Sequence, residues 1–285
     1  MLDNKEIGRW LDGIVPAWSL LAPDSFNSLQ RPPTTARTAI GLAADLSMDE
    51  VFTSPMARNA LIVLEAAAKP PGLKLTSTGN LSRQVVTAMF ERLDWPGLER
   101  DVILQLHKVI NEPDFLPLYF VRNLLEASRL VRTHKGHLVI TPAGRKVLDG
   151  TRLPTLQAVL FESTFWKIDL GCFSRGFLGN WPQDHIGIVL WCLGVSAEQW
   201  IEPHRLVRLC TLPVEGMLRR PHDIPQYALE GAILRPLEAF GLFESREDPI
   251  PGERFGSKTF YRKSQFFDRF LTFDVKLATD GAVRH

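Results

Sequence analysis

The chain has 285 residues, 45% of them hydrophobic, so it can form one large or two ordinary domains with buried cores. Its 33 basic and 32 acidic residues give a net charge of +1, which excludes nucleic-acid binding through overall charge. Three cysteines without a Cys-x-x-Cys pair argue against a disulfide framework or a zinc ribbon, and the start shows no signal-peptide pattern. We therefore expect a cytoplasmic protein.

Residues 1–50 are expected to form an N-terminal arm. A helix is predicted from Glu6 to Ile14, and prolines and threonines interrupt the patterns that follow it. Ser54 and Pro55 then mark a helix start, because Ser is a preferred N-cap and Pro is preferred at the first helical position. The Ala- and Leu-rich residues 57–68 behind this cap predict a buried helix.

A short strand and two helices are predicted next. Residues 73–75 alternate apolar and polar side chains, and Asn80 is the predicted N-cap of a helix that reaches Leu93. Between Trp95 and Pro113 the pattern adds one more helix, at a place where a winged helix-turn-helix normally has a short turn.

Residues 118–148 predict a helix, a β-hairpin and a second helix. Apolar side chains recur at helical spacing in residues 120–125, so one face of the first helix is expected to pack. Lys135 and Gly136 separate two β-prone runs, and glycine supplies the positive φ that a tight turn needs. Thr141, which a proline follows, is the predicted N-cap of the second helix.

The order helix, strand, helix, helix and hairpin over residues 55–140 predicts a winged helix-turn-helix. Residues 237–245 repeat the Leu-Glu-Ala, Leu and hydroxyl positions of residues 125–133, which predicts a second copy with a longer hairpin. The apolar run 186–195 between them is a buried helix, since crossing a bilayer takes about 20 residues. The predicted fold is mainly α (α+β), with an arm at 1–50, two winged helix-turn-helix-like units at 51–150 and 203–285, and a helical middle at 151–202.

The polar face of the helix over residues 120–129 suits contact with double-stranded DNA. Arg and Asn match the donors and acceptors of base edges, and Arg and Lys neutralise phosphates. Glu126 on the same face would repel phosphate, so an ordinary solvated helix face is the alternative. The candidate nucleic-acid-binding residues are Arg122, Asn123 and Arg129 on the helix, and Arg132, Lys135 and Lys146 beside the hairpin.

In the second unit the corresponding surface is acidic. Gln226, Glu230 and Glu238 are expected to face solvent, which is a poor surface for a polyanion, so we interpret this unit as a packing or homodimerisation element. The second unit also contains a cluster of arginines, which we interpret as an ordinary solvated helix face. That possible basic strip consists of Arg205, Arg208, Arg219 and Arg220.

Three motifs resemble a family of bacterial proteins of unknown function that are similar to the third open reading frame of the pRi plasmid. They are Leu-Lys-Leu-Thr-x-x-Gly-Asn-Leu at residues 73–81, Leu-Leu-Glu-x-x-x-Leu-Val at 124–131 and Leu-Val-Ile-Thr-x-x-Gly at 138–144. The resemblance covers about residues 72–170, and a weaker similarity is found near residues 234–273. It implies a prokaryotic cytoplasmic protein, often encoded on mobile elements, and carries no established activity.

No strong catalytic or metal-binding constellation is found. His134 and His137 lack Cys or carboxylate partners at ligand spacing, and the Asp-x-Lys pattern of Asp274 and Lys276, typical of metal-dependent nucleases, lacks an evident second acidic ligand. No Gly-rich phosphate loop occurs, so no cofactor is predicted. The sequence favours a non-enzymatic DNA-binding or transcription-regulating protein; the alternatives are a protein-interaction or dimerisation module on the same fold and, more weakly, a nuclease.

Overall fold

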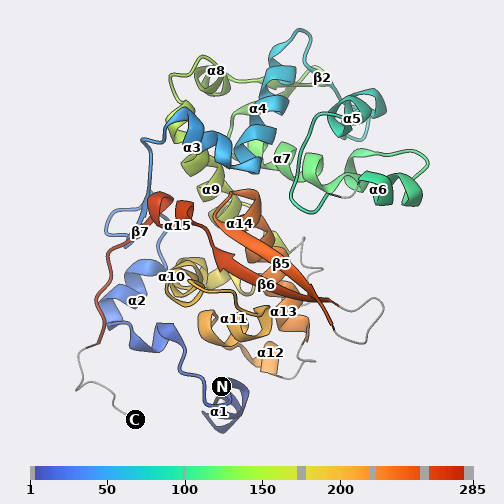
Figure 1. Ribbon diagram of the computed structural model, residues 1–285. Helices are drawn as coiled ribbons and strands as arrows, with labels where there is room; N and C mark the ends of the chain where they lie inside the picture. Colours follow the sequence, from blue (N-terminus) through green and yellow to red (C-terminus); the bar gives the residue numbers. More distant parts are fainter. Residues whose placement is uncertain (1–3, 99, 172–177, 219–222, 251–256, 279–285) are drawn as a thin grey trace. The chain divides into compact units, whose positions relative to one another are not determined.

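The computed structural model describes residues 4–98, 100–171, 178–218, 223–250 and 257–278 (Figure 1). Helices and small antiparallel sheets make it an α+β protein, as predicted. The chain divides into two compact units, which we call the central unit, Ala44–Ile168, and the split unit, Met1–Ala43 with Asp169–His285. The predicted helical middle, 151–202, is shared between these units, and the division into four predicted segments stays a prediction.

The central unit is helical around one small sheet. Its core lies between α4, α7 and α9, whose inward side chains are buried. Its elements are α3 (Met48–Thr53), α4 (Pro55–Ala68), β2 (Leu73–Lys74), α5 (Arg83–Phe90), α6 (Arg100–Leu106), η2 (Glu112–Asp114), α7 (Leu116–Ala127), β3 (Val131–His134), β4 (His137–Ile140), α8 (Pro142–Leu148), η3 (Leu153–Thr155) and α9 (Leu156–Trp166).

The predicted starts and turns of this unit are mostly confirmed. The Ser54 hydroxyl accepts from the backbone N–H of Ala57 and caps α4. Lys135 and Gly136 both have positive φ, 48° and 73°, so the β3–β4 hairpin closes through a tight turn. The predicted N-cap Asn80 is wrong: the N-cap of α5 is Ser82, two residues later, because the Asn80 carbonyl closes a turn by accepting from the Thr76 N–H at 2.7 Å.

The three strands of the central unit pair in the order β2-β4-β3, all antiparallel. Leu73 and Leu138 face each other, and both are buried on the side of the sheet that covers the core. Gly144 lets α8 approach the hairpin, because a Cβ there would collide with the carbonyl oxygen of Leu130. The hairpin is therefore fixed to the helices at its base, while its turn is exposed.

The split unit joins the first 43 residues to the last third of the chain. Pairing of β1 with β7 ties the two segments together. Its elements are α1 (Asn4–Leu11), η1 (Ala17–Leu20), α2 (Pro23–Leu29), β1 (Ile40–Leu42), η5 (Gln183–His185), α10 (Ile186–Ser196), α11 (Pro203–Cys210), α12 (Glu215–Leu218), α13 (Asp223–Leu229), η6 (Glu230–Leu234), α14 (Arg235–Ala239), β5 (Phe243–Pro249), β6 (Ser257–Lys263), α15 (Gln265–Phe270) and β7 (Leu271–Phe273).

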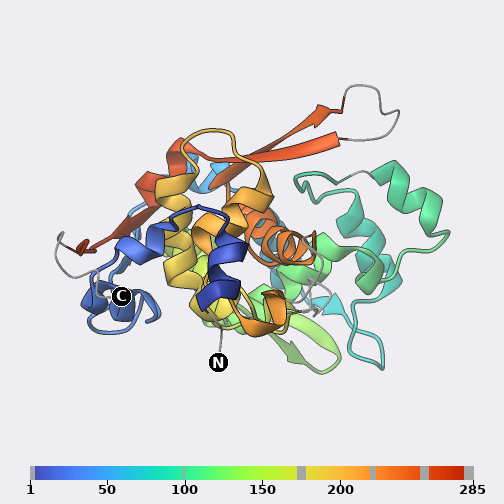
Figure 2. The ribbon, with the colours of Figure 1, turned by 90° about the horizontal axis from the view of Figure 1, so that it is seen from below.

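The predicted buried helix is α10, in which every residue from Ile186 to Gly194 is buried. Gly187 allows α2 to lie against it, since a Cβ at this position would collide with the Leu29 carbonyl oxygen. In the ranges that the structure describes, no helix is both long and apolar enough to cross a bilayer. Figure 2 shows β5 and β6 extending as a two-stranded ribbon from the helices of this unit.

The two sequence segments that resemble each other make the same backbone hydrogen bonds. In the central unit the Leu130 N–H donates to the Leu125 carbonyl at 2.9 Å, and in the split unit the Leu242 N–H donates to the Leu237 carbonyl at 2.9 Å. Each bond turns the chain from the end of a helix into a hairpin. The internal repeat seen in the sequence therefore corresponds to one local geometry formed twice.

The caps after the two hairpins also correspond. The Thr141 hydroxyl donates to the Arg129 carbonyl at 2.8 Å, and the Ser264 hydroxyl donates to the Gly241 carbonyl at 2.7 Å. Arg129 and Gly241 both have positive φ, 58° and 72°. One prediction for the second copy is wrong: Glu230 does not face solvent but is buried, at 6% exposure.

Candidate nucleic-acid interface

The helix that was predicted to carry base-reading residues, α7, is almost entirely covered. Its apolar face is buried, and among its twelve residues Leu116 at the N-terminus is the exposed one. Arg122 and Asn123 lie half-buried on the remaining face. Few α7 atoms are thus available to a large ligand.

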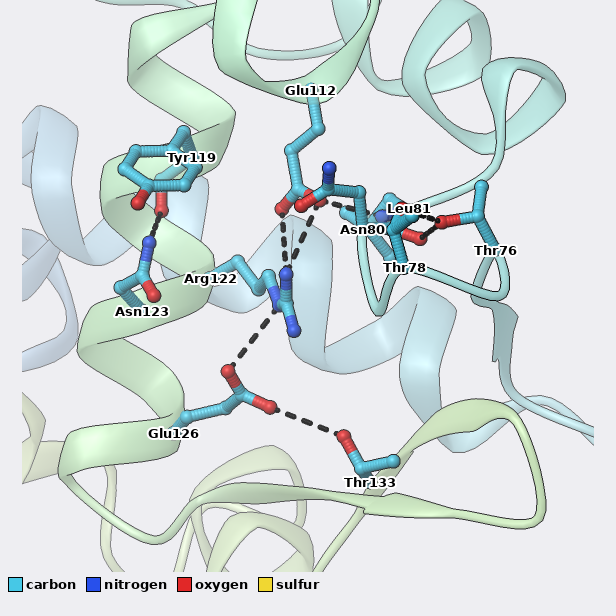
Figure 3. Close-up of polar contacts among 10 residues, drawn as sticks. All are labelled: Thr76, Thr78, Asn80, Leu81, Glu112, Tyr119, Arg122, Asn123, Glu126 and Thr133. Carbon is cyan, nitrogen blue, oxygen red and sulfur yellow. Dashed lines mark hydrogen bonds and ion pairs between the residues drawn. The ribbon is translucent and has the colours of Figure 1, made fainter.

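Arg122 is held between two carboxylates (Figure 3). Its Nη1 donates to both oxygens of Glu112, at 3.3 and 3.2 Å, and its Nε lies 3.3 Å from Glu126 Oε2. The Arg122 side chain is only 11% exposed and that of Glu112 is 0% exposed. This arginine is therefore neutralised inside the unit.

The same network reaches the segment before α5 on one side and the β3–β4 hairpin on the other. Glu112 also accepts from the backbone N–H of Leu81 at 2.5 Å, just beyond the turn before α5. Glu126 accepts from the Thr133 hydroxyl on β3 at 3.4 Å. A chain of polar contacts thus connects η2, α7 and the hairpin.

Burial raises the pKa of Glu112 above its usual value, because removing the carboxylate from water disfavours its charged form. The Leu81 N–H and the Arg122 guanidinium act in the opposite direction and stabilise the carboxylate. The network is thus a buried ion pair, in which removal of either partner leaves an uncompensated charge.

Asn123 is engaged locally as well. Its side-chain amide donates to the Tyr119 carbonyl at 2.7 Å, one turn earlier in α7. Of the six predicted contact residues, Arg122 and Asn123 are therefore engaged within the unit, Arg122 through its ion pairs with Glu112 and Glu126 and Asn123 through its hydrogen bond to the Tyr119 carbonyl.

The other four predicted residues lie on the surface. Arg129 follows α7, Arg132 lies on β3, Lys135 is in the hairpin turn and Lys146 is in α8, and all four are exposed. Within the part of the chain that the structure describes, none of them forms an ion pair. Lys146 interacts electrostatically with the exposed Asp149, and the charges of the other three residues are available to an external anion.

Strand pairing adds residues that sequence reasoning missed. Lys74 on β2 is paired with His137, which is paired with His134, and Arg132 lies two residues before His134 on β3. Paired residues of antiparallel strands point to the same face, and so do residues two apart. Lys74 was missed as a candidate contact residue because its strand is distant in sequence from the hairpin. Arg145 is also exposed, and it could have been found as a candidate from the sequence because it lies beside Lys146.

The β5–β6 hairpin of the split unit differs in this respect, because three cations on its described strands are neutralised. Arg262 lies 2.6 Å from Glu244, and Arg246 lies 2.9 Å from Asp248. Lys258 lies 3.1 Å from Glu202. In the part of the chain that the structure describes, the β3–β4 hairpin thus has cations outside ion pairs, and the strands of β5–β6 have paired ones.

The described residues contain no group of three or more His, Cys, Asp or Glu arranged to hold a metal ion. The exposed Asp274 uses its backbone N–H to bond the Ala39 carbonyl at 2.8 Å. Cys192 and Cys210 are buried free thiols, and Cys172 lies outside the described residues.

Comparison with known proteins finds similarity within the central unit. Residues 52–152 match the family model described as the Y4jL N-terminal domain. An uncharacterized protein, y4jL, of Sinorhizobium fredii (strain NBRC 101917 / NGR234) is 36% identical over 101 residues, which are 35% of this chain and 46% of that protein. This chain thus spans less than half of that relative, and no solved structure matches. The match overlaps the region of the pRi-plasmid resemblance, and that finer assignment stays a prediction.

Proposed function

We propose that the central unit is a winged-helix module that binds double-stranded nucleic acid through phosphate contacts, and that the protein acts in DNA binding or transcription regulation. The observation that carries the proposal is the contrast between the described strands of the two hairpins: the cations on and beside β3–β4 are exposed and form no ion pair, whereas Arg246, Lys258 and Arg262 of β5–β6 are neutralised. Exposed unpaired cations attract a polyanion by releasing its condensed counterions.

The local charge supports this assignment. Between Arg129 and Arg152 the sequence holds six Lys and Arg residues and one Asp, in a chain whose net charge is only +1. Positive charge is therefore concentrated at the hairpin and α8, and a local concentration of this kind guides anionic partners to one face. The β2-β4-β3 order supports the winged-helix part of the proposal, since β3 and β4 form the wing.

The proposal divides the six predicted residues into two groups. Arg129, Arg132, Lys135 and Lys146 contact phosphates. Arg122 and Asn123 are positioning residues, because Arg122 is paired with Glu112 and Glu126 and the Asn123 amide donates to the Tyr119 carbonyl. The phosphate contacts of the first group orient a protein on a duplex without reading its sequence.

The test compares the two hairpins within the full chain. Affinity for a short fluorescent duplex of mixed sequence is measured by anisotropy at low salt. The variant with Arg132→Gln and Lys135→Gln is expected to bind at least about tenfold more weakly, because two charge-assisted phosphate contacts are lost. The matched control, with Arg246→Gln and Lys258→Gln, is expected to bind as the wild type does. Equal losses in both variants, or no binding by the wild type, would overturn the proposal.

A protein-interaction module is the second candidate, and α6 favours it. This helix has no buried residue, although most of its residues are apolar: Leu104 is 53% and Leu106 is 73% exposed. Exposed apolar clusters frequently mark protein-binding sites. If this candidate is correct, Leu104→Ser with Leu106→Ser abolishes association of the purified chain in light scattering, and duplex affinity stays negligible at every salt concentration.

A further inference from the structure

A cleft in the split unit has no place in the proposed nucleic-acid function. It has a volume of about 330 Å³, within the usual range of small-molecule sites, and lies between α1, α11, α12 and α13. Its wall is partly apolar, with Val207, Met217 and Pro225, and Trp10 of α1 adds an aromatic ring. Such a surface suits a ligand with an aromatic body.

Two opposite charges line this cleft without neutralising each other. Arg208 is half-buried and Asp223 is exposed, and neither has an ion-pair or hydrogen-bond partner for its side chain among the residues that the structure describes. The cleft histidine, His204, is occupied, since its Nδ1 lies 3.0 Å from Glu202 Oε2. A half-buried guanidinium without a partner retains its full capacity to bind a carboxylate.

The wall that carries Arg208 is held in place. At the end of α11 the Thr211 carbonyl accepts from the Trp18 indole at 3.0 Å, and the next carbonyl, of Leu212, accepts from the Trp181 indole at 2.9 Å. Thr211 and Trp181 are buried. The segment between α11 and α12 is thus fixed before any ligand arrives, which lowers the entropic cost of binding.

We propose that this cleft binds a small aromatic zwitterion of the free amino-acid class. The ligand's carboxylate binds Arg208, its ammonium group binds Asp223, and its ring lies against Trp10 and the apolar wall. A ligand with both charges is required, because an uncharged one leaves Arg208 unpaired and a simple carboxylate leaves Asp223 unused.

Isothermal titration of the full chain with three related probes tests the proposal. L-phenylalanine carries both charges, phenylacetate carries only the carboxylate, and 2-phenylethanol carries neither. Saturable binding is expected to be tightest for L-phenylalanine and at least about tenfold weaker for 2-phenylethanol, since a hydrogen-bonded charge contact is lost.

Variants on the two cleft charges connect the binding to this site. Arg208→Gln is expected to weaken L-phenylalanine binding at least about tenfold, and Asp223→Asn is expected to remove its advantage over phenylacetate. Arg205→Gln is the matched control, because Arg205 is an exposed arginine of the same helix outside the cleft, and it is expected to leave binding unchanged. Circular dichroism verifies that each variant is folded. The proposal is overturned if L-phenylalanine does not bind at millimolar concentration, if the three probes bind alike, or if Arg208→Gln and Arg205→Gln have the same effect.

Discussion

Replacement of Glu112 by alanine tests the buried network most severely. Glu112→Ala removes both contacts to Arg122, at 3.2 and 3.3 Å, and the acceptor of the Leu81 N–H. Arg122 is then left at 11% exposure with Glu126 as its one remaining carboxylate. Removing one partner of a buried ion pair typically costs about 3–5 kcal/mol, and we expect this range here.

The free energy should be measured for the central unit itself, because a chain with two compact units need not unfold in one step. Hydrogen–deuterium exchange of its peptides over a series of urea concentrations gives a regional free energy of unfolding. Glu65→Ala is the matched control, since Glu65 forms an exposed ion pair with Arg92 at 3.5 Å, and it should cost less than about 1 kcal/mol.

A double-mutant cycle separates the ion pair from the loss of side-chain volume. Arg122→Met alone should also destabilise the unit, and the double variant should cost less than the sum of the single ones by about 1–3 kcal/mol. If Glu112→Ala costs no more than Glu65→Ala, or if the two effects simply add, Arg122 is not held by Glu112 and the positioning role is wrong.

Three further predictions concern other parts of the fold. Gly144→Ala should cost the central unit about 1–3 kcal/mol in the same exchange measurement, because the added methyl group collides with the Leu130 carbonyl; an unchanged regional free energy would contradict this. Burial raises the pKa of Glu230 in the folded protein above its ordinary 4.5. The contribution of the protonated side chain to folding stability is therefore fully present below pH 4.5 and is lost as the pH rises through the pKa of the folded state. The unfolding free energy of Glu230→Gln relative to the wild type should therefore rise between pH 4.5 and 8. A difference between the two proteins that does not change with pH would refute the argument. Burial also raises the pKa of the Cys192 and Cys210 thiols, so iodoacetamide should modify neither in the folded protein, as peptide mass spectrometry can verify.

Local sequence signals predicted much of the fold. The Ser54 cap, the turn at Lys135 and Gly136 and the start of α8 at Thr141 were found because each depends on residues within a few positions of one another. The buried helix α10 was equally evident from its unbroken apolar run. The added helix before α7 was expected as well, and it is α6.

Long-range contacts were beyond the reach of these signals. Arg122 was placed on a free face because the helical period exposes it, but Glu112, ten residues earlier, covers it through a contact that periodicity does not encode. Glu230 was assigned to solvent for the same reason and is buried. Lys74 lies on the same face of the sheet as Arg132 only because β2 pairs with β4, and this pairing depends on the register between strands that are distant in sequence.

The salt dependence of duplex binding is the most direct test of the central claim that the exposed cations on and beside β3–β4 bind phosphates. For the wild type, the logarithm of the association constant should fall linearly with the logarithm of salt concentration, with a slope of about −3 to −4 if Arg129, Arg132, Lys135 and Lys146 each contact a phosphate. Lys146→Gln should make that slope shallower by about one, since one phosphate contact is lost. A wild-type slope near zero, or a slope that Lys146→Gln leaves unchanged, would contradict the account.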